Sequence, residues 1–199
     1  MASPSSAPSA LTERLEDPGS LDDPGWLDDP GLRTPAAIVG VALLIRLAWA
    51  SWLPIEPVSD SAMYHTFAQR IASGLGYVHP DGSPTAYFAV GPSFVYSLAF
   101  RSGLPPLPLI AFVQALVGAA SVAGVMAVAR RWVETRPAWL AGGLLALWPS
   151  QIQFTTVLAS ELLFTAAVLL AWFLWERPRA GGLQRGAFVG IALGVAAYL

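Results

Sequence analysis

Long apolar segments alternate with short polar ones along most of the chain. Five of them lie at about 36–53, 107–129, 137–156, 159–175 and 184–199. Most reach the roughly 17–25 residues that a helix needs to cross a hydrocarbon core. Seven of the eight tryptophans lie near the ends of these segments, as the aromatic belts at a membrane interface require. The pattern predicts an all-α fold, a polytopic transmembrane helix bundle of about five spans within residues 35–199.

A sixth apolar segment, 88–100, is short and contains Gly91-Pro92. Its placement decides the topology, and the arginines distinguish the two arrangements. If the segment lies along the outer surface, eight arginines outside the spans face the cytoplasm and two face outward; if it spans, the division is three to seven. Because cytoplasmic loops carry an excess of basic residues, we favour the first arrangement, with a cytoplasmic N-terminus.

In that arrangement a long first external loop, about 54–106, contains two amphipathic interfacial helices. We predict these helices at 59–74 and 92–102. The second external loop is short, near 151–161. Both loops therefore place carboxylates on the same side of the membrane.

Composition narrows the class of protein. With 55% hydrophobic and 12% charged residues, the chain is typical of a multi-pass protein of the cell membrane. A net charge of −2 gives no reason to expect nucleic acid as a partner. The lack of cysteine excludes disulfides, thiolate metal sites and cysteine catalysis. Residues 1–34, which are Ser/Pro/Ala-rich and then acidic with three Asp-Pro-Gly repeats, predict a disordered acidic cytoplasmic tail.

Asp60 is the main candidate for chemistry among the few acids outside the tail. It stands at the start of the first interfacial helix, at an apolar boundary where a charge is costly and is retained for function. Its alternative role is structural, since Ser59 or Asp60 can cap the first turn of the helix. Tyr64 follows one turn later on the same face. It can orient Asp60, bind a sugar, or simply belong to the aromatic belt.

Three further residues have two interpretations each. His65 can titrate near neutral pH or be an ordinary solvated interfacial histidine. Glu161, after Ser160 at the outer start of the fourth span, is either a helix cap or part of the site. Arg46 lies inside the first span, where it snorkels to the outer headgroups or clamps a lipid phosphate; we favour snorkelling.

Several kinds of site are missing from the sequence. His65, His79 and Asp60 have no metal-ligand spacing, so we assign no metal site, although a divalent cation stays open as a cofactor. There is no glycine-rich nucleotide loop, Gly-x-Ser-x-Gly elbow or zinc motif. We therefore expect an activated substrate to arrive through the lipid.

Taken together in order and spacing, a set of short motifs resembles the GT-C superfamily of polyprenyl-phosphate-sugar-dependent glycosyltransferases. The similarity is to the family 39-like branch, which contains protein O-mannosyltransferases and aminoarabinose transferases. It covers about 36–175, the N-terminal portion of such an enzyme. The motifs are Asp60 with Tyr64, Ala68, Gly74-Leu-Gly-Tyr77, Pro84-Thr-Ala-Tyr-Phe-Ala-Val-Gly-Pro92, Ala129-Arg-Arg131, Ala146-Leu-Trp-Pro149 and Ser160-Glu-Leu-Leu-Phe164.

The resemblance implies transfer of a lipid-linked sugar, with inversion, to an acceptor hydroxyl on the extracytoplasmic face. Asp60 would be the general base, and the acceptor would be a glycan, lipid or protein. Aminoarabinose-transferase-like members have a Glu-Lys pair before two prolines, where this chain reads Ala89-Val90-Gly91-Pro92. This departure argues against the lipid A branch. Because the chain stops at Leu199 inside an apolar run, we expect it to be a fragment of a longer enzyme.

Two functions from other classes stay open. A transporter or flippase-like protein would have paired broken helices and an internal repeat, and no such repeat is visible in the sequence. A non-catalytic membrane scaffold would use the acidic tail to recruit partners.

Overall fold

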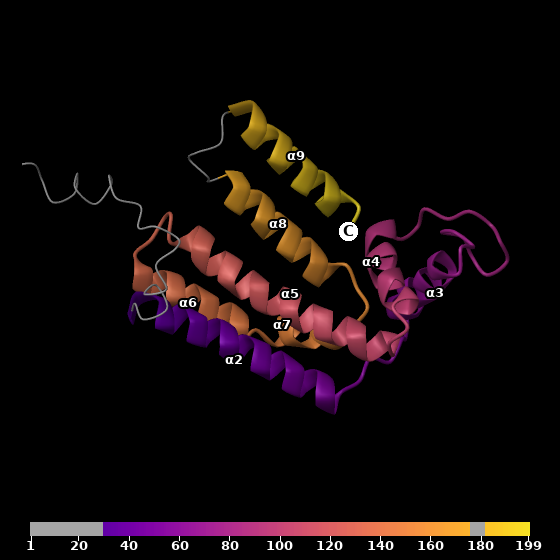
Figure 1. Cartoon of the computed structure of the whole chain (residues 1–199), viewed down its shortest axis with the longest axis horizontal. Coiled ribbons are helices and arrows are strands. Elements are labelled where there is room, and N and C mark those ends of the chain that lie inside the picture. Colours follow the sequence, from indigo (N-terminus) through magenta and orange to yellow (C-terminus); the bar gives the residue numbers. More distant parts are fainter. Residues whose placement is uncertain (1–29, 176–181) are drawn as a thin grey trace, which may run out of the picture. The chain divides into compact units, whose positions relative to one another are not determined.

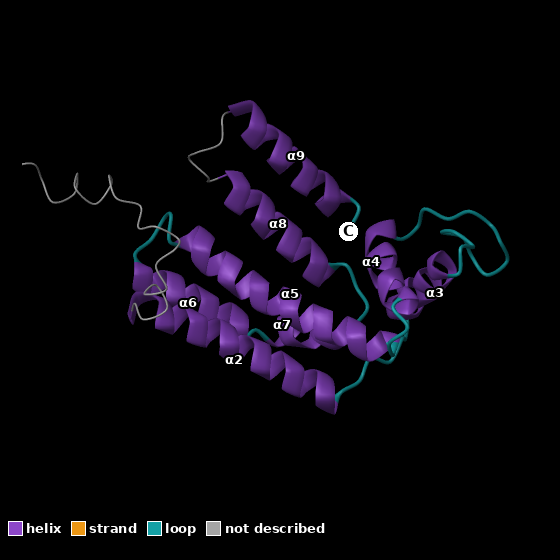
Figure 2. Ribbon diagram, viewed as in Figure 1, coloured by secondary structure: helices purple, strands orange, loops and turns teal. Residues whose placement is uncertain are grey.

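The computed structural model describes residues 30–175 and 182–199, and all regular elements in this part of the chain are helices (Figure 2). The all-α prediction is therefore confirmed for the described residues. The chain divides into two compact units, Met1–Arg33 and Thr34–Leu199. All packing discussed below lies within the second unit. The predicted acidic tail falls almost wholly on residues 1–29, outside the described part.

Among the described residues, two helices are long and apolar enough to cross a membrane. They are α2 (Pro30–Trp52), through its part Arg33–Trp52, and α5 (Pro106–Ala129). Their lengths of 20 and 24 residues match the first two predicted spans. Pro106 begins α5, where a missing backbone N–H costs no helical hydrogen bond. The last predicted span is the shorter helix α9 (Gly182–Ala197).

The third predicted span, 137–156, is wrong as a single helix. Helix α6 (Thr135–Ala146) ends early, and α7 (Pro149–Gln153) and the 3-10 helix η2 (Phe154–Thr156) follow it. The cause is Pro149, because a proline ring disfavours helical geometry at the residue before it. That residue, Trp148, is extended, with φ −68° and ψ 116°.

The fourth predicted span is helix α8 (Glu161–Trp175), which joins the preceding short helices at a sharp bend. The segment Pro149–Thr156 meets α8 at 117°, so the two form either one broken span or a re-entrant loop. The described residues thus provide two complete candidate spans and one bent pair in place of five continuous spans.

Helix α5 is central to the packing of the second unit (Figure 1). It contacts α6 and α8, and α8 in turn contacts α9. A cluster of buried apolar side chains joins α2, α5 and α6 through Ala42, Val122, Met126 and Ala146. The two alanines, Ala42 and Ala146, let the helix backbones approach closely.

The two predicted interfacial helices are present as α3 (Asp60–Ala72) and α4 (Val90–Arg101). They pack against each other, and α4 also contacts α5. The Arg101 guanidinium donates from Nη2 to the Ile71 carbonyl oxygen at 2.6 Å, at the negative end of the α3 dipole. Tyr64 and Ala68 of α3 share a buried cluster with Tyr96 of α4. This pairing fixes the face of α3 that carries the candidate site.

Replacing Gly118 in α5 by alanine should destabilise the protein. A Cβ there would lie 2.4 Å from Nε and 2.8 Å from Cδ of Arg46, which crosses α5 at this point. Overpacking of this kind costs about 1–3 kcal/mol, measurable as a lower unfolding temperature in detergent. Gly124→Ala is the matched control on the same helix, because its Cβ would meet Leu169 at an ordinary 3.5 Å. Equal unfolding temperatures for the two variants would contradict the packing of Arg46 against α5.

Candidate functional site

Asp60 is the first residue of α3, and its side chain is exposed. The preceding residue, Ser59, has φ 52° and ψ −129°, the only positive φ of a non-glycine residue in the described part of the chain. Such a backbone costs on the order of 1–3 kcal/mol and tends to occur at functional sites. Ser59 makes no side-chain capping hydrogen bond. The structure therefore gives no support to Ser59 as a side-chain cap of this helix.

Glu161 stands at the corresponding position of α8, as its first residue and also exposed. The Ser160 hydroxyl donates to Glu161 Oε2 over a long 3.5 Å, and the Thr165 hydroxyl donates to the Glu161 backbone oxygen at 2.7 Å. A carboxylate in the first turn is stabilised by the positive end of the helix dipole. Asp60 and Glu161 both occupy this position, each at the start of its helix.

Tyr64 joins the two carboxylates into one cluster. Burial raises the pKa of its phenol, a hydrogen bond with Ser160 lowers it, and the negative charges of Glu161 and Asp60 raise it further. The geometric link is the Ser61 hydroxyl, which accepts from the Leu158 N–H at 3.2 Å and so brings this part of α3 to the segment that leads to Glu161. The structure thus brings together three of the predicted site residues, from two loops far apart in the sequence.

Buried polar side chains hold the segment 157–160, which precedes Glu161, in place. The Tyr96 hydroxyl of α4 donates to the Ala159 oxygen at 2.7 Å and accepts from the Ala159 N–H at 3.3 Å. The Ser61 hydroxyl accepts from the Leu158 N–H at 3.2 Å. Gln114 of α5 donates from Nε2 to the Thr155 oxygen at 3.2 Å. Because these bonds come from α3, α4 and α5, they fix Glu161 beside α3.

The sequence interpretation missed these polar residues, although a signal for them exists. Gln114 is a polar side chain inside the span 107–129, and Tyr96 lies inside the apolar segment 88–100. Polar groups at such positions are costly unless they have a partner. Gln114 is 1% exposed and Tyr96 2% exposed. Each therefore marked a position that needed a partner from elsewhere in the chain.

Arg46 does not snorkel, so that prediction is wrong. Its side chain is fully buried, and Nη1 donates to the oxygens of Ala42 at 3.0 Å and Ala146 at 3.3 Å. The bare backbone of Gly118 leaves room for the side chain. In the described part of the chain no hydrogen bond links Arg46 to Asp60 or Glu161.

His65 packs against α4. Its ring forms an edge-on contact with Phe100, with centroids 5.4 Å apart, and burial lowers the pKa of its imidazole. The ring is therefore half-buried rather than freely solvated, and its part in substrate binding stays a prediction.

An aromatic cluster anchors the rest of the first loop to α3. The Phe67 ring is fully buried and contacts Tyr77 at 4.5 Å between centroids, while Phe88 contacts Tyr64 at 5.4 Å. The Tyr77 hydroxyl donates to the Phe88 oxygen at 2.9 Å. Through Phe88, this cluster also supports the Tyr64 ring from the side of the loop.

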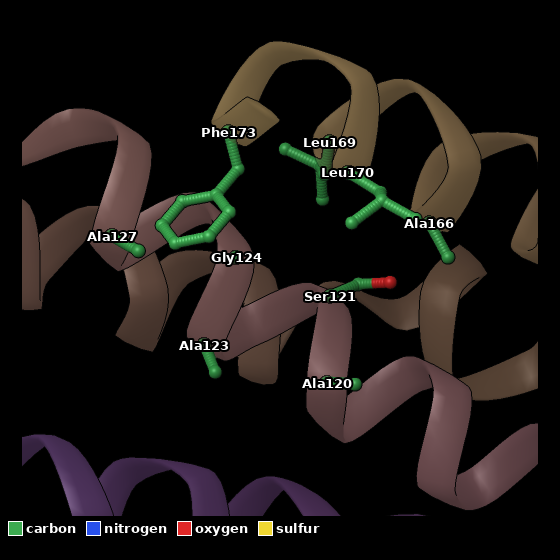
Figure 3. Close-up of a pocket in the computed structure, with 9 residues that line it drawn as sticks. All are labelled: Ala120, Ser121, Ala123, Gly124, Ala127, Ala166, Leu169, Leu170 and Phe173. Atoms are coloured by element: carbon green, nitrogen blue, oxygen red, sulfur yellow. The ribbon is translucent and has the colours of Figure 1, made fainter. Parts of the chain in front are cut away.

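Two apolar cavities lie along α5. One, of about 430 Å³, separates α5 from α8 and is lined by small residues of α5 facing Leu169, Leu170 and Phe173 (Figure 3). The other, of about 210 Å³, lies between α4, α5 and α8, and Tyr96, Gln114 and Leu163 are among its lining residues. The second cavity therefore shares two side chains with the polar network behind the candidate site.

The described residues contain no group of three or more His, Asp or Glu side chains able to hold a metal ion. Comparison of the chain with protein-family models, with curated proteins and with solved structures gives no match. The glycosyltransferase resemblance accordingly stays a prediction. The functional argument rests on the cluster of Asp60, Tyr64 and Glu161.

Tyr96→Phe should lower the free energy of unfolding by about 1–3 kcal/mol, the cost of leaving the Ala159 amide and carbonyl without their partner. Thermal or denaturant unfolding in detergent measures this loss. Tyr87→Phe is the matched control, because Tyr87 is 86% exposed. A loss equal to that of Tyr87→Phe would exclude the role of the Tyr96 hydroxyl.

Removing either carboxylate charge should lower the pKa of Tyr64. A negative charge disfavours the phenolate, so Glu161→Gln and Asp60→Asn each make its formation easier. The pKa should still stay above its ordinary value, because burial is the largest cause of the shift. Selective labelling of Tyr64 for an NMR titration measures the change, with Asp81→Asn as the control in the same loop. An unchanged pKa in both site variants would show that the cluster does not form.

Proposed function

We propose that the protein is a membrane glycosyltransferase that moves a sugar from a polyprenyl-phosphate donor to an acceptor hydroxyl. The reaction takes place on the extracytoplasmic face of the cell membrane. The observation that carries the proposal is the hydrogen bond from the Leu158 N–H to the Ser61 hydroxyl. It brings the start of α3, with Asp60 and Tyr64, to the segment that leads to Glu161. The motifs around Asp60 and Glu161 resemble those of GT-C enzymes, and this resemblance supplies the class of substrate.

The proposed setting is a polytopic bundle with a cytoplasmic N-terminus. Supporting observations are the apolar helices α2 and α5, the bent pair ending in α8, and the arginine distribution. In this setting α3 and α4 are the interfacial helices of the first external loop. The candidate carboxylates then lie outside the hydrocarbon core.

In the proposed reaction Asp60 is the general base. The acceptor oxygen attacks the anomeric carbon while Asp60 takes the hydroxyl proton. The bond between the anomeric carbon and the phosphate oxygen breaks, and polyprenyl phosphate leaves with the electron pair. The configuration at the anomeric carbon inverts, and Asp60 later returns its proton to water.

The other site residues would bind and orient substrate. Tyr64 can donate from its hydroxyl to a sugar or acceptor oxygen, because burial and the nearby charges keep it protonated. Glu161 can accept from sugar hydroxyls, and half-buried His65 can contact the donor. Arg46 is fully buried, so the phosphate-clamp interpretation has no support. The apolar cavity beside Tyr96 has the chemistry to hold part of a hydrocarbon chain.

Asp60→Asn should lower transfer by a factor of about 10²–10⁴, the range for loss of a general base. Transfer is measured with the full chain in proteoliposomes, using a panel of labelled polyprenyl-phosphate hexoses and pentoses. Glu56→Gln is the matched control, since Glu56 is an exposed acid of the same loop. Activity of Asp60→Asn equal to that of Glu56→Gln would overturn the assignment. So would chemical labelling that places residues 54–106 on the cytosolic side.

Transport is the second candidate, and one observation favours it. Discontinuous helices at mid-membrane depth are typical of transporters, and the pair Pro149–Thr156 and Glu161–Trp175 bends by 117°. A transporter fold built on repeats would have a second bent pair that matches the first. The described residues contain only one bent pair. Uptake of a labelled lipid-linked sugar into vesicles, unaffected by Asp60→Asn, would favour transport over transfer.

A further inference from the structure

Helix α2 contacts the chain on both sides of the break that follows α6. Before the break, Arg46 Nη1 donates to the oxygen of Ala146, the last residue of α6, at 3.3 Å. After it, Trp49 Nε1 donates to the hydroxyl of Thr156, the last residue of η2, at 3.0 Å. Arg46 and Trp49 are three positions apart, so they lie on one face of the helix.

Three helices form the site that the Arg46 side chain occupies. Its side chain is fully buried, Gly118 of α5 leaves room for it, and the carbonyl end of α6 receives its hydrogen bond. That end carries the negative pole of the α6 dipole, which favours a cation. The side chain therefore fits this position by both shape and charge.

Stability alone does not explain a buried arginine here. Its Nε and Nη2 groups have no hydrogen-bond partner among the described residues. Burying a charge with unmade hydrogen bonds is expensive, and an apolar side chain of similar size is commonly as stable or more so. An apolar side chain cannot, however, donate a hydrogen bond to the carbonyl oxygen of Ala146, where α6 ends.

We propose that Arg46 and Trp49 form a clamp that fixes the break between α6 and α8, and thereby holds Ser160 and Glu161 beside Tyr64. Between the two contacts the chain runs from Ala146 to Thr156, and Glu161 follows five residues later. Because both ends of this stretch are hydrogen-bonded to α2, the residues that follow Thr156 and lead to Glu161 start from a fixed position. Arg46 and Trp49 are thus positioning residues, not catalytic ones. Only their effect on turnover rests on the proposed glycosyl transfer.

The chain contains no cysteine, so a single introduced thiol reports on one position. We would place it by Ser160→Cys, which preserves side-chain size, and measure its labelling by a membrane-impermeant maleimide in proteoliposomes. Arg46→Met should raise the labelling rate about tenfold, the factor equivalent to about 1.4 kcal/mol for one lost charged hydrogen bond. Trp49→Phe should raise it severalfold, because it keeps the ring but removes the donor. Arg46→Lys should restore slow labelling, since the ammonium can still donate to a carbonyl.

The matched control is Ser73→Cys at the end of α3, which is exposed and bonds only within its own helix. Its labelling should be the same in every background. Rates at Ser160→Cys within twofold of the parent in both Arg46→Met and Trp49→Phe would overturn the clamp. If Arg46→Met does not fold, the Trp49→Phe and Arg46→Lys results decide the matter in the same way.

Steady-state kinetics provide a second measurement. A purely structural role of Arg46 would not produce the same pattern of KM changes. Displacement of Glu161 should raise the KM for the lipid-linked sugar, and Arg46→Met should add little to the KM of Glu161→Gln. Full additivity of the two substitutions would contradict positioning through Glu161. If the labelling results hold but the parent protein shows no transfer, the proposed function fails and the clamp stands.

Discussion

Backbone groups at a break in an apolar bundle need hydrogen-bond partners, and this requirement organises the molecule. Between Ala146 and Glu161 the chain leaves α6, passes through two short helices and enters α8 at a steep angle. Carbonyls and amides that are buried in this stretch need partners from the protein. Side chains that bond backbone groups of this stretch are Arg46, Ser61, Tyr96 and Gln114, and Trp49 bonds the Thr156 hydroxyl.

Those partners come from α2, α3, α4 and α5, so the break ties these four helices together. Apolar packing is weakly directional in a membrane, because lipid tails are as apolar as leucine. Hydrogen bonds have defined geometry and specify one arrangement. The network therefore determines where α8 begins, and with it the position of Glu161.

The candidate site follows from this arrangement. Asp60 and Glu161 each open a helix, where the dipole stabilises their charges, and Tyr64 lies in the field of both. The positive φ of Ser59 lowers local stability at the start of α3, and such strain tends to occur at functional sites. Two carboxylates and a phenol are the groups that the proposed acid–base chemistry on a hydroxyl-bearing substrate would use.

Local patterns in the sequence were enough to predict most helices. Helices α2 and α5 follow from long continuous apolar runs, and the loop helices α3 and α4 from the patterns of their own shorter segments. Asp60 and Glu161 were recognisable because acids are rare outside the tail. Pro149 signalled an interruption, although its consequence, a complete break with a 117° bend, was not visible in the pattern.

Only the tertiary structure decided which polar side chains find which partners. The sequence made Arg46 look like a snorkelling residue, since nothing near it in the chain reveals the bare surface of Gly118 or the carbonyl of Ala146. Tyr96 and Gln114 likewise gain their meaning from residues more than 40 positions away. Helix formation is local and can be read residue by residue, whereas satisfaction of a buried polar group depends on contacts that exist only after the helices have packed.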